Sequence, residues 1–261
     1  MSALQTQAMP TSRPFQFTAH NIELAPGDCT MDDQPLVSEW PLVHAALRTL
    51  RLAFGRSTMK GLRIVDLGAL EGGYTVEFAR AGFDALGIEG RTSNYEKCQY
   101  VAQRLSLPNL RFALDDVRNL ESHGTFDATF CCGLLYHLDE PVAFLRKLGR
   151  LTRRVLLLQT HYAPLDGVQT QWTLSPMTIN EGRRGRWYGE FPEGTPPEKQ
   201  SPWSSVGNSR SFWLAKEHLL QAMREAGFTT LYEQYDFLAH QVDDRYIQQN
   251  SRSLFVGLKE V

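Results

Sequence analysis

The sequence predicts a doubly wound α/β fold built around one large parallel sheet. From Leu62 onward, short runs of β-branched or apolar residues alternate with amphipathic stretches, as successive βαβ units require. A glycine-rich stretch, VDLGALEGG at 65–73, directly follows the first of these runs. The chain has 261 residues, of which 42% are hydrophobic, so it is long enough to fill the core of one such domain.

The individual elements follow from hydrophobic pattern and from turn residues. Strands are predicted at 62–67, 84–89, 110–114, 126–132, 153–159, 229–235 and 253–259. Helices are predicted at 73–81, 93–105, 139–150 and 214–226. Asp139 is the expected N-cap of the third helix, with Pro141 in its first turn, and Gly227 ends the fourth.

The N-terminal region precedes this pattern and differs from it. Residues 1–35 are rich in Pro, Gly and Gln and show little periodicity, which predicts an extended arm. Ser38 is the expected N-cap of a covering helix with apolar residues at helical spacing over 40–54, and Gly55 is its stop signal. We therefore divide the chain into an arm with a covering helix, 1–57, and a main domain, 58–261.

Composition and charge exclude several classes of protein. The 27 Lys and Arg against 29 Asp and Glu give a formal charge of −2, so no global field attracts nucleic acid or an anionic membrane. The four cysteines lack zinc-type spacing and are interpreted as reduced thiols. The N-terminus has no apolar signal region, and no stretch approaches the roughly 18 apolar residues of a membrane span. We expect a cytoplasmic protein, a monomer or homodimer, without a metal.

The glycine-rich stretch predicts a ligand-binding turn between a strand and a helix. Gly68 at the strand end lets the backbone turn sharply and lets a ligand approach, and the following helix N-terminus offers free N–H groups. A dinucleotide fingerprint would need glycine at position 70, which is Leu70, with Gly72 and Gly73 further on. The spacing therefore disfavours a pyrophosphate cradle.

Polar residues also follow the next three strands. Glu89 and Gly90 end the second strand, Asp115 and Asp116 follow the third, and residues 132–137 (CGLLYH) follow the fourth. Because the carboxyl ends of parallel strands meet at one edge of the sheet, these groups should face a common crevice. A carboxylate in the position of Glu89 can accept both hydroxyl groups of a ribose.

Together these motifs indicate a family. VDLGALEGG, LGIEGR, LDDVRNL and FDATFCCGLLYHLDEP, in this order and spacing, resemble the class I S-adenosylmethionine-dependent methyltransferases over roughly residues 60–160. The resemblance implies a Rossmann-like sheet of seven strands whose last two form an antiparallel pair. It also implies S-adenosylmethionine as cofactor and S-adenosylhomocysteine (SAH) as product.

The resemblance assigns cofactor contacts to residues that lie at strand ends. These are Asp66, Gly68, Ala69, Gly72, Glu89, Gly90, Asp115, Asp116, Val117, Cys132 and Gly133. It implies that the first four line the methionine part, that Glu89 holds the ribose, and that the backbone at 132–133 receives the amino group. Asp116, with Asp115 as its competitor, would accept from the adenine amino group beside the Val117 N–H. Asp66 as a turn residue and Asp116 as a helix cap are the structural alternatives. Leu70 and Glu71 depart from the family pattern.

Candidate catalytic residues follow the fourth and fifth strands. Methyl transfer from a sulfonium depends mainly on positioning, and a base is needed only when the nucleophile carries a proton. His137 is the candidate base beside Tyr136, because this place faces the methyl group in the family's fold; a helix-capping or packing histidine is the alternative. His161, beside Tyr162, forms a second candidate pair at the same rim.

The segment 163–210 is too long for a simple connection and predicts a substrate-binding lid inserted after the fifth strand. The candidate substrate contacts are Tyr162, Arg183, Arg186, Tyr188, Asn208 and Arg210. Arginines suit an acceptor that bears an acidic group. However, residues 181–210 hold five Lys or Arg against four Asp or Glu, so an internally paired, solvated loop is the alternative.

Three functions are compatible with these observations. The first is methyl transfer to a small molecule, which the lid favours. The second is alkylation of the wobble uridine of transfer RNA, because GLLYHLDEP is similar to enzymes of that kind, although the net charge gives no reason to expect nucleic acid as a partner. The third is a non-catalytic S-adenosylmethionine-binding protein.

Overall fold

The computed structural model describes residues 14–168, 170–235 and 251–260. Residues 1–13 of the predicted arm and position 169 of the predicted lid lie outside the described residues. The segment 236–250, between the last two predicted strands, does so as well.

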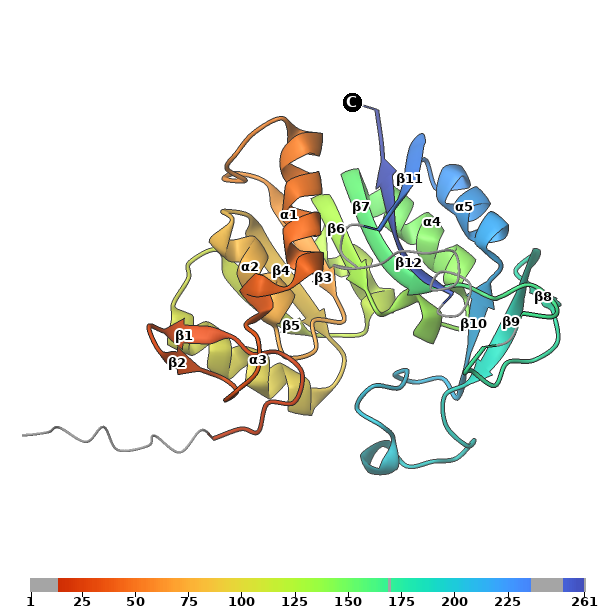
Figure 1. Ribbon diagram of the computed structural model, residues 1–261, viewed down its shortest axis with the longest axis horizontal. Coiled ribbons are helices and arrows are strands. Elements are labelled where there is room, and N and C mark those ends of the chain that lie inside the picture. Colours follow the sequence, from red (N-terminus) through yellow and green to blue (C-terminus); the bar gives the residue numbers. More distant parts are fainter. Residues whose placement is uncertain (1–13, 169, 236–250, 261) are drawn as a thin grey trace, which may run out of the picture.

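A seven-stranded sheet forms the centre of the molecule (Figure 1). Its strands are β3 (Arg63–Leu67), β4 (Asp84–Glu89), β5 (Leu110–Leu114), β6 (Phe126–Cys132), β7 (Thr152–His161), β11 (Thr230–Gln234) and β12 (Arg252–Leu258). The order is β11-β12-β7-β6-β3-β4-β5. The five strands from β3 to β7 run parallel, and β12 is antiparallel to both β7 and β11. The predicted sheet and its antiparallel last pair are confirmed.

Helices cover both faces of the sheet. The main helices are α1 (Pro41–Phe54), α2 (Gly73–Arg80), α3 (Thr92–Leu105), α4 (Pro141–Leu151) and α5 (Lys216–Glu225). Alternate strand residues enter two separate cores: Val155 and Leu157 pack with α1 to α3, and Leu156 and Leu158 pack with α4 and α5. Strands buried on both faces are continuously apolar, which is why the sequence pattern located them well.

The start of α1 differs from the prediction. Ser38 lies in a short 3-10 helix, η1 (Val37–Glu39), and Trp40 is the N-cap of α1, without a side-chain capping bond. Pro41 occupies the first helical position, where its missing N–H costs nothing. Gly55 ends the helix in the left-handed conformation, as predicted.

The predicted cap of α4 is wrong. The Asp139 carboxylate forms an ion pair with Arg118 and does not cap the helix. Instead, the backbone N–H groups of Val142 and Ala143 donate to the carboxylate of Glu181, at 2.8 and 2.7 Å. A carboxylate some 40 residues away in sequence therefore caps this helix, a contact that a local capping rule cannot predict.

The remaining elements are short. A hairpin of β1 (Glu23–Ala25) and β2 (Asp28–Cys29) precedes η1, and three further 3-10 helices are η2 (Val117–His123), η3 (Leu135–His137) and η4 (Pro197–Lys199). Residues 163–210, called the insertion below, contain β8 (Thr178–Asn180) and β9 (Arg183–Gly189). These strands pair with β10 (Arg210–Leu214) in a separate antiparallel sheet beside the main one (Figure 1).

The structure also bears on the predictions about the cysteines and about membrane-spanning helices. All four cysteines are free thiols, of which Cys98 and Cys131 are buried and Cys29 and Cys132 are partly exposed. Cys131 and its neighbour Cys132 contact opposite cores, because successive side chains of a strand point to opposite faces of the sheet. Within the described ranges, no helix is long and apolar enough to cross a bilayer. The cytoplasmic location stays a prediction.

Candidate active site

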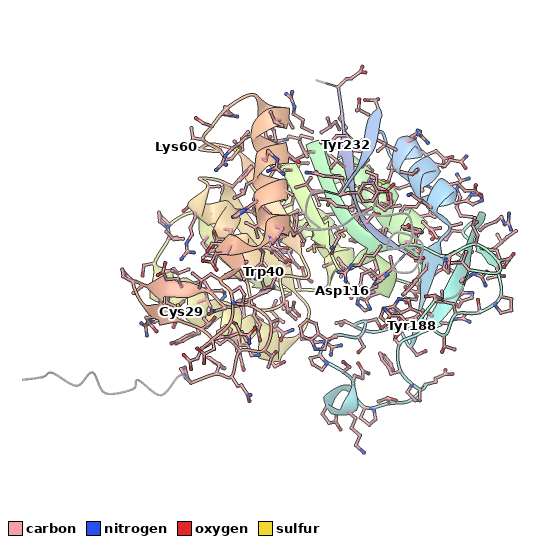
Figure 2. All side chains as sticks on the ribbon, in the orientation of Figure 1. Cys29, Trp40, Lys60, Asp116, Tyr188 and Tyr232 are labelled. Carbon is pink, nitrogen blue, oxygen red and sulfur yellow. The ribbon has the colours of Figure 1, made fainter. Side chains whose placement is uncertain are left out.

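A cavity of about 730 Å³ lies at the carboxyl ends of the parallel strands. One part, the strand-end half, is lined by Gly68, Leu70, Glu89, Gly90, Asp116, Val117, Cys132 and Gly133. The other part, the aromatic half, is lined by Tyr136, His137, His161, Trp172, Tyr188, Glu190, Trp213 and Arg252. Figure 2 shows Asp116 between Trp40, at the base of α1, and Tyr188, on β9.

Glu89 is held firmly in the strand-end half. Its side chain is buried, and its two oxygens accept the backbone N–H groups of Leu70 and Arg91, each at 2.8 Å. Burial raises the pKa of Glu89, and these two hydrogen bonds oppose the rise. The Asn94 amide also donates to Oε1, at the longer distance of 3.5 Å, while Oε2 keeps a second lone pair that can accept a hydrogen bond from a ligand.

The turn after β3 is formed although position 70, where the family pattern has glycine, is a leucine. Gly68 has φ +75°, and Leu70 has φ +55°, a left-handed conformation that is uncommon for a leucine. The backbone N–H groups of Gly68 and Ala69 donate to the Ile88 carbonyl, which ties the turn to β4. The Leu70 N–H is in turn bound by Glu89. The tertiary hydrogen bonds thus hold Leu70 where many family members carry glycine.

Asp66 lies beneath this turn and does not line the cavity. It is buried, and its carboxylate accepts from the Thr75 hydroxyl at 2.6 Å. Burial raises the pKa of Asp66 to about 7; the Thr75 hydrogen bond opposes this, and the nearby Glu89 charge adds to it.

Glu71, the second departure, does not line the cavity and anchors the N-terminal segment. Its carboxylate accepts the backbone N–H groups of Thr18, Ala19 and His20, and it pairs with Lys97 at 2.6 Å. Although burial would raise it, the pKa of Glu71 is lowered by Lys97 and the backbone donors. The N-terminal segment at Thr18–His20 thereby becomes part of the cavity wall.

His20 is the ionisable residue of this segment. Its Nδ1 accepts the backbone N–H of Gly73 at 3.0 Å, so this nitrogen carries no proton. Burial lowers the pKa of His20 to about 4, against the opposing charge of Glu71. The ring is therefore neutral, with its proton on Nε2.

The insertion closes over the strand-end half through two arginines. Arg91 donates to the carbonyls of Ser204 and Ser205, at 3.0 and 2.9 Å. Arg118 donates to the Asn208 side chain at 2.7 Å, while its backbone N–H and its guanidinium bind the Asp116 carboxylate. Residues 201–206 line the cavity as a result, and we call them the roof.

Stacked rings form the wall of the aromatic half. His161 stacks on Trp213 with ring centroids 4.7 Å apart, and Tyr188 stacks on the same Trp213 at 5.3 Å. The edges of Tyr136 and Trp172 meet His161 at 4.7 and 5.2 Å. Such packing gives a rigid wall with apolar faces.

His137 and Glu190 form a direct polar contact in the aromatic half. The Nδ1 atom of His137 lies 2.9 Å from Oε1 of Glu190, whose side chain is 1% exposed. The Ser211 hydroxyl and the Ser205 backbone N–H also donate to this carboxylate, at 2.7 and 3.1 Å. In the described part of the chain, no residue hydrogen-bonds Nε2 of His137.

Arg252, at the start of β12, brings a positive charge to the same half. Its guanidinium donates to the Gln159 side chain at 2.8 Å and lies 5.6 Å from the centre of the Tyr136 ring. Its Nε atom is buried and has no hydrogen-bond partner among the residues that the structure describes. Within the described ranges, no carboxylate pairs with Arg252.

Comparisons with known proteins identify the family of this fold. A family model for a methyltransferase domain matches residues 64–154. The solved N-terminal domain of EvdMO1, crystallised in the presence of SAH and D-fucose, is 27% identical with a TM-score of 0.65. That match covers 92% of this chain and 90% of the other.

Residues 64–154 thus form a domain of the class I S-adenosylmethionine-dependent methyltransferase family. Pavine N-methyltransferase of Thalictrum flavum subsp. glaucum is 28% identical over 141 residues, which are 52% of this chain and 37% of that enzyme. Ubiquinone biosynthesis O-methyltransferase of Paracidovorax citrulli (strain AAC00-1) is 28% identical over 122 residues, which are 45% of this chain and 51% of that enzyme. The chain thus spans about half of the length of these curated relatives, or less.

The cavity includes most of the residues that the sequence predicted as cofactor contacts. Gly68, Glu89, Gly90, Asp116, Val117, Cys132 and Gly133 line it, whereas Asp66, Ala69, Gly72 and Asp115 do not. Asp115 accepts hydrogen bonds from Asn119 and pairs with His123, outside the cavity. Asp116 also makes the helix-capping contact given as its alternative, since it caps η2.

The candidate catalytic residues Tyr136, His137 and His161 all line the cavity, but most predicted substrate contacts do not. Of the latter, only Tyr188 lines it; Tyr162, Arg183, Arg186, Asn208 and Arg210 lie outside. The reason is internal pairing: Arg183 pairs with Glu225, and Arg186 with Asp166, while Arg210 lies over the Trp187 ring at 4.2 Å. Only the pair of Arg186 with Asp166 lies within the insertion and agrees with the alternative of an internally paired loop, because Glu225 belongs to α5.

Four residues that the sequence did not single out matter for the cavity: Glu190, Arg252, Trp172 and His20. Glu190 carries no local signal, because its partner His137 lies 53 residues away. A contact between a histidine and a carboxylate that is distant in sequence can be found only from the fold. In the described part of the chain, no three His, Cys, Asp or Glu side chains form a group that could hold a metal ion.

Proposed function

We propose that this methyltransferase transfers a methyl group from S-adenosylmethionine to a hydroxyl oxygen of a small molecule. The observation that carries the proposal is the single cavity that joins the strand-end half to the aromatic half. A transferase of this kind must hold two ligands in line, and one continuous cavity with two chemically different halves suits that requirement.

The strand-end half fits the cofactor. Glu89 offers a buried, fixed carboxylate to two ribose hydroxyls. Gly68 and Gly133, with φ of +75° and +70°, leave backbone without side chains at the cavity wall. When bound, S-adenosylmethionine supplies an electrophilic methyl group on a sulfonium, and the electrons of the broken C–S bond stay on sulfur in SAH. The residues of this half only bind and orient.

His137 suits a nucleophile that carries a proton. Its Nε2 belongs to a side chain that lines the aromatic half and keeps a free lone pair when Nδ1 donates to Glu190. As the acceptor oxygen bonds to the methyl carbon, its proton moves to Nε2 of His137. A neutral amine would need no such base, so the dyad favours a hydroxyl. The curated relatives include both an N- and an O-methyltransferase, so they do not decide the acceptor atom.

The aromatic half favours a ring-shaped acceptor with a hydroxyl group. Flat ring faces such as Tyr188 and Trp213 stack on rings that have an apolar face. The similar EvdMO1 domain was crystallised in the presence of D-fucose, which supports a sugar-like ring. An acidic group on this acceptor, which the sequence suggested through the insertion arginines, would instead meet Arg252.

Label transfer tests this function. The protein, with methyl-labelled S-adenosylmethionine, is given free sugars including D-fucose, phenols, amines and a fractionated cell extract, and products are identified by mass spectrometry. SAH affinity is measured in parallel by calorimetry. We expect SAH binding and an O-methylated small molecule. The Glu89→Ala variant serves as a control that should lose both signals.

Other outcomes would overturn the proposal in different ways. N-methylated products alone would contradict the hydroxyl acceptor. Label in the RNA fraction would favour the transfer RNA alternative. SAH binding without label in any fraction would favour the non-catalytic alternative, and no SAH binding would contradict the assignment of the strand-end half.

A further inference from the structure

We infer that Glu190, a residue of the insertion, is the positioning residue that fixes His137 in the tautomer able to accept a proton from the acceptor. The inference deepens the proposed function and rests on it. Glu190 stands directly after β9, and its carboxylate reaches across the cavity edge to Nδ1 of His137 at 2.9 Å. The insertion would then complete the proton-accepting group as well as cover the ligands.

The surroundings of Glu190 determine which atom donates. A carboxylate can only accept, and three groups converge on this one: the Ser211 hydroxyl, the Ser205 backbone N–H and the His137 ring. The Ser205 N–H cannot reverse its role. The contact with His137 is therefore Nδ1–H donating to Oε1, which leaves the proton off Nε2 in the neutral ring.

The His137 backbone is held from the same side. The Asn208 side chain, also in the insertion, donates to the His137 carbonyl at 2.9 Å, and the Trp213 indole donates to the Tyr136 carbonyl at 2.9 Å. The ring itself packs against Tyr136, with centroids 4.3 Å apart. Both the main chain and the ring of His137 are thus oriented by contacts that do not involve a ligand.

The other groups around the ring do not compete for Nδ1. His161 from β7 and Tyr188 from β9 complete the wall, and Arg252 from β12 lies across the Tyr136 ring. Glu190 is the carboxylate that contacts the imidazole in the described structure. When His137 accepts a proton, Glu190 faces the new positive charge directly, which stabilises it.

The substitution Glu190→Gln gives a sharp test because the glutamine amide has two different ends. The Ser205 N–H requires an acceptor, so the amide oxygen should face Ser205. The amide NH₂ then faces Nδ1 of His137, which must become the acceptor. The proton moves to Nε2, on the cavity side, and the ring can no longer accept a proton there.

Nitrogen NMR of the ¹⁵N-histidine-labelled full chain reads this directly. Spectra are taken at about pH 9, well above the ordinary imidazole pKa of about 6.5, and the His137 signals are assigned by their loss in His137→Gln. We expect the proton on Nδ1 in the wild type and on Nε2 in Glu190→Gln. Glu193→Gln, on an exposed position of the same insertion, is the matched control and should match the wild type.

Two results would overturn the inference: a wild-type proton on Nε2, or an unchanged tautomer in Glu190→Gln. If Glu190→Gln does not fold, Ser211→Ala removes one donor and keeps the carboxylate; a proton on Nε2 in this variant would contradict the role of Glu190. With a methylated acceptor in hand, Glu190→Gln should lower kcat by roughly a hundredfold or more and leave SAH affinity unchanged. The spectra decide the inference even if no acceptor is methylated, so its failure and that of the proposed function remain distinct.

Discussion

The two halves of the cavity are built in different ways. The strand-end half comes from consecutive βα turns, between Gly68 and Gly133, so the order of the strands alone brings its residues together. The aromatic half joins η3, the end of β7, the insertion, β10 and β12, over residues 136–252. The first follows from local connectivity, and the second depends on long-range packing. A family can therefore keep one half while the other changes with the acceptor.

The largest effect is expected from a substitution of His137, which should affect the function of the aromatic half and leave the strand-end half intact. His137→Ala removes the proposed proton acceptor, so turnover should fall by at least about a hundredfold, while SAH affinity stays unchanged. Steady-state kinetics with calorimetry check this. A parallel loss of SAH affinity would show that the halves are not independent, and an unchanged turnover would return His137 to a packing role.

In the strand-end half, Glu89→Gln should weaken SAH binding by about 30-fold, because the loss of one charge-assisted hydrogen bond costs about 2 kcal/mol. Burial raises the pKa of Glu89, so wild-type affinity should also fall on acidification as the carboxylate takes up a proton, and the variant should lack this dependence. Calorimetry across pH measures both. Glu96→Gln, exposed on α3, is the control; equal affinities in the two variants would contradict the role of Glu89.

The next prediction concerns the free energy of unfolding. Asp66, buried beneath the turn after β3, should destabilise the fold when its carboxyl group is ionised. Its pKa rises from 3.8 to about 7 on folding, so the native state binds the proton more tightly and stability is lost as pH rises through this interval. Asp66→Asn cannot ionise and avoids the loss. Urea unfolding should show the variant gaining roughly 4 kcal/mol on the wild type between about pH 4 and pH 8. A difference independent of pH would contradict the burial effect.

The smallest effect concerns charge in the aromatic half. Arg252→Gln should raise the KM of an acidic acceptor by about tenfold, equivalent to about 1.4 kcal/mol, and leave SAH affinity unchanged. Arg183→Gln, whose side chain pairs with Glu225 outside the cavity, should leave both constants unchanged. A raised KM in Arg183→Gln together with an unchanged KM in Arg252→Gln would instead support the insertion arginines as substrate contacts. If SAH affinity also falls in Arg252→Gln, the anionic group that Arg252 binds belongs to the cofactor and not to the acceptor.

The same contrast explains what could be predicted from the sequence. The ranges 84–89, 110–114 and 126–132 match β4, β5 and β6. β4 and β6 are largely buried on both faces and form nearly continuous apolar runs, whereas the edge strand β5 alternates buried and exposed residues. Glu89 could be located because it ends the first of these runs. The Asp139 cap was wrong because Glu181 reaches α4 from the insertion. Arg183 and Arg186 lie outside the cavity because Glu225 and Asp166, distant in sequence, pair with them, which the sequence could not reveal.

The roof has a consequence for the order in which ligands enter and leave. Arg91 and Arg118 bind the roof directly beside Glu89 and Asp116, so a molecule seated in the strand-end half lies underneath it. We therefore expect a compulsory sequence in which the cofactor enters first and SAH leaves last. Product-inhibition patterns would show SAH competing with S-adenosylmethionine but not with the acceptor. Release of SAH from beneath the roof would then be the rate-limiting step of turnover.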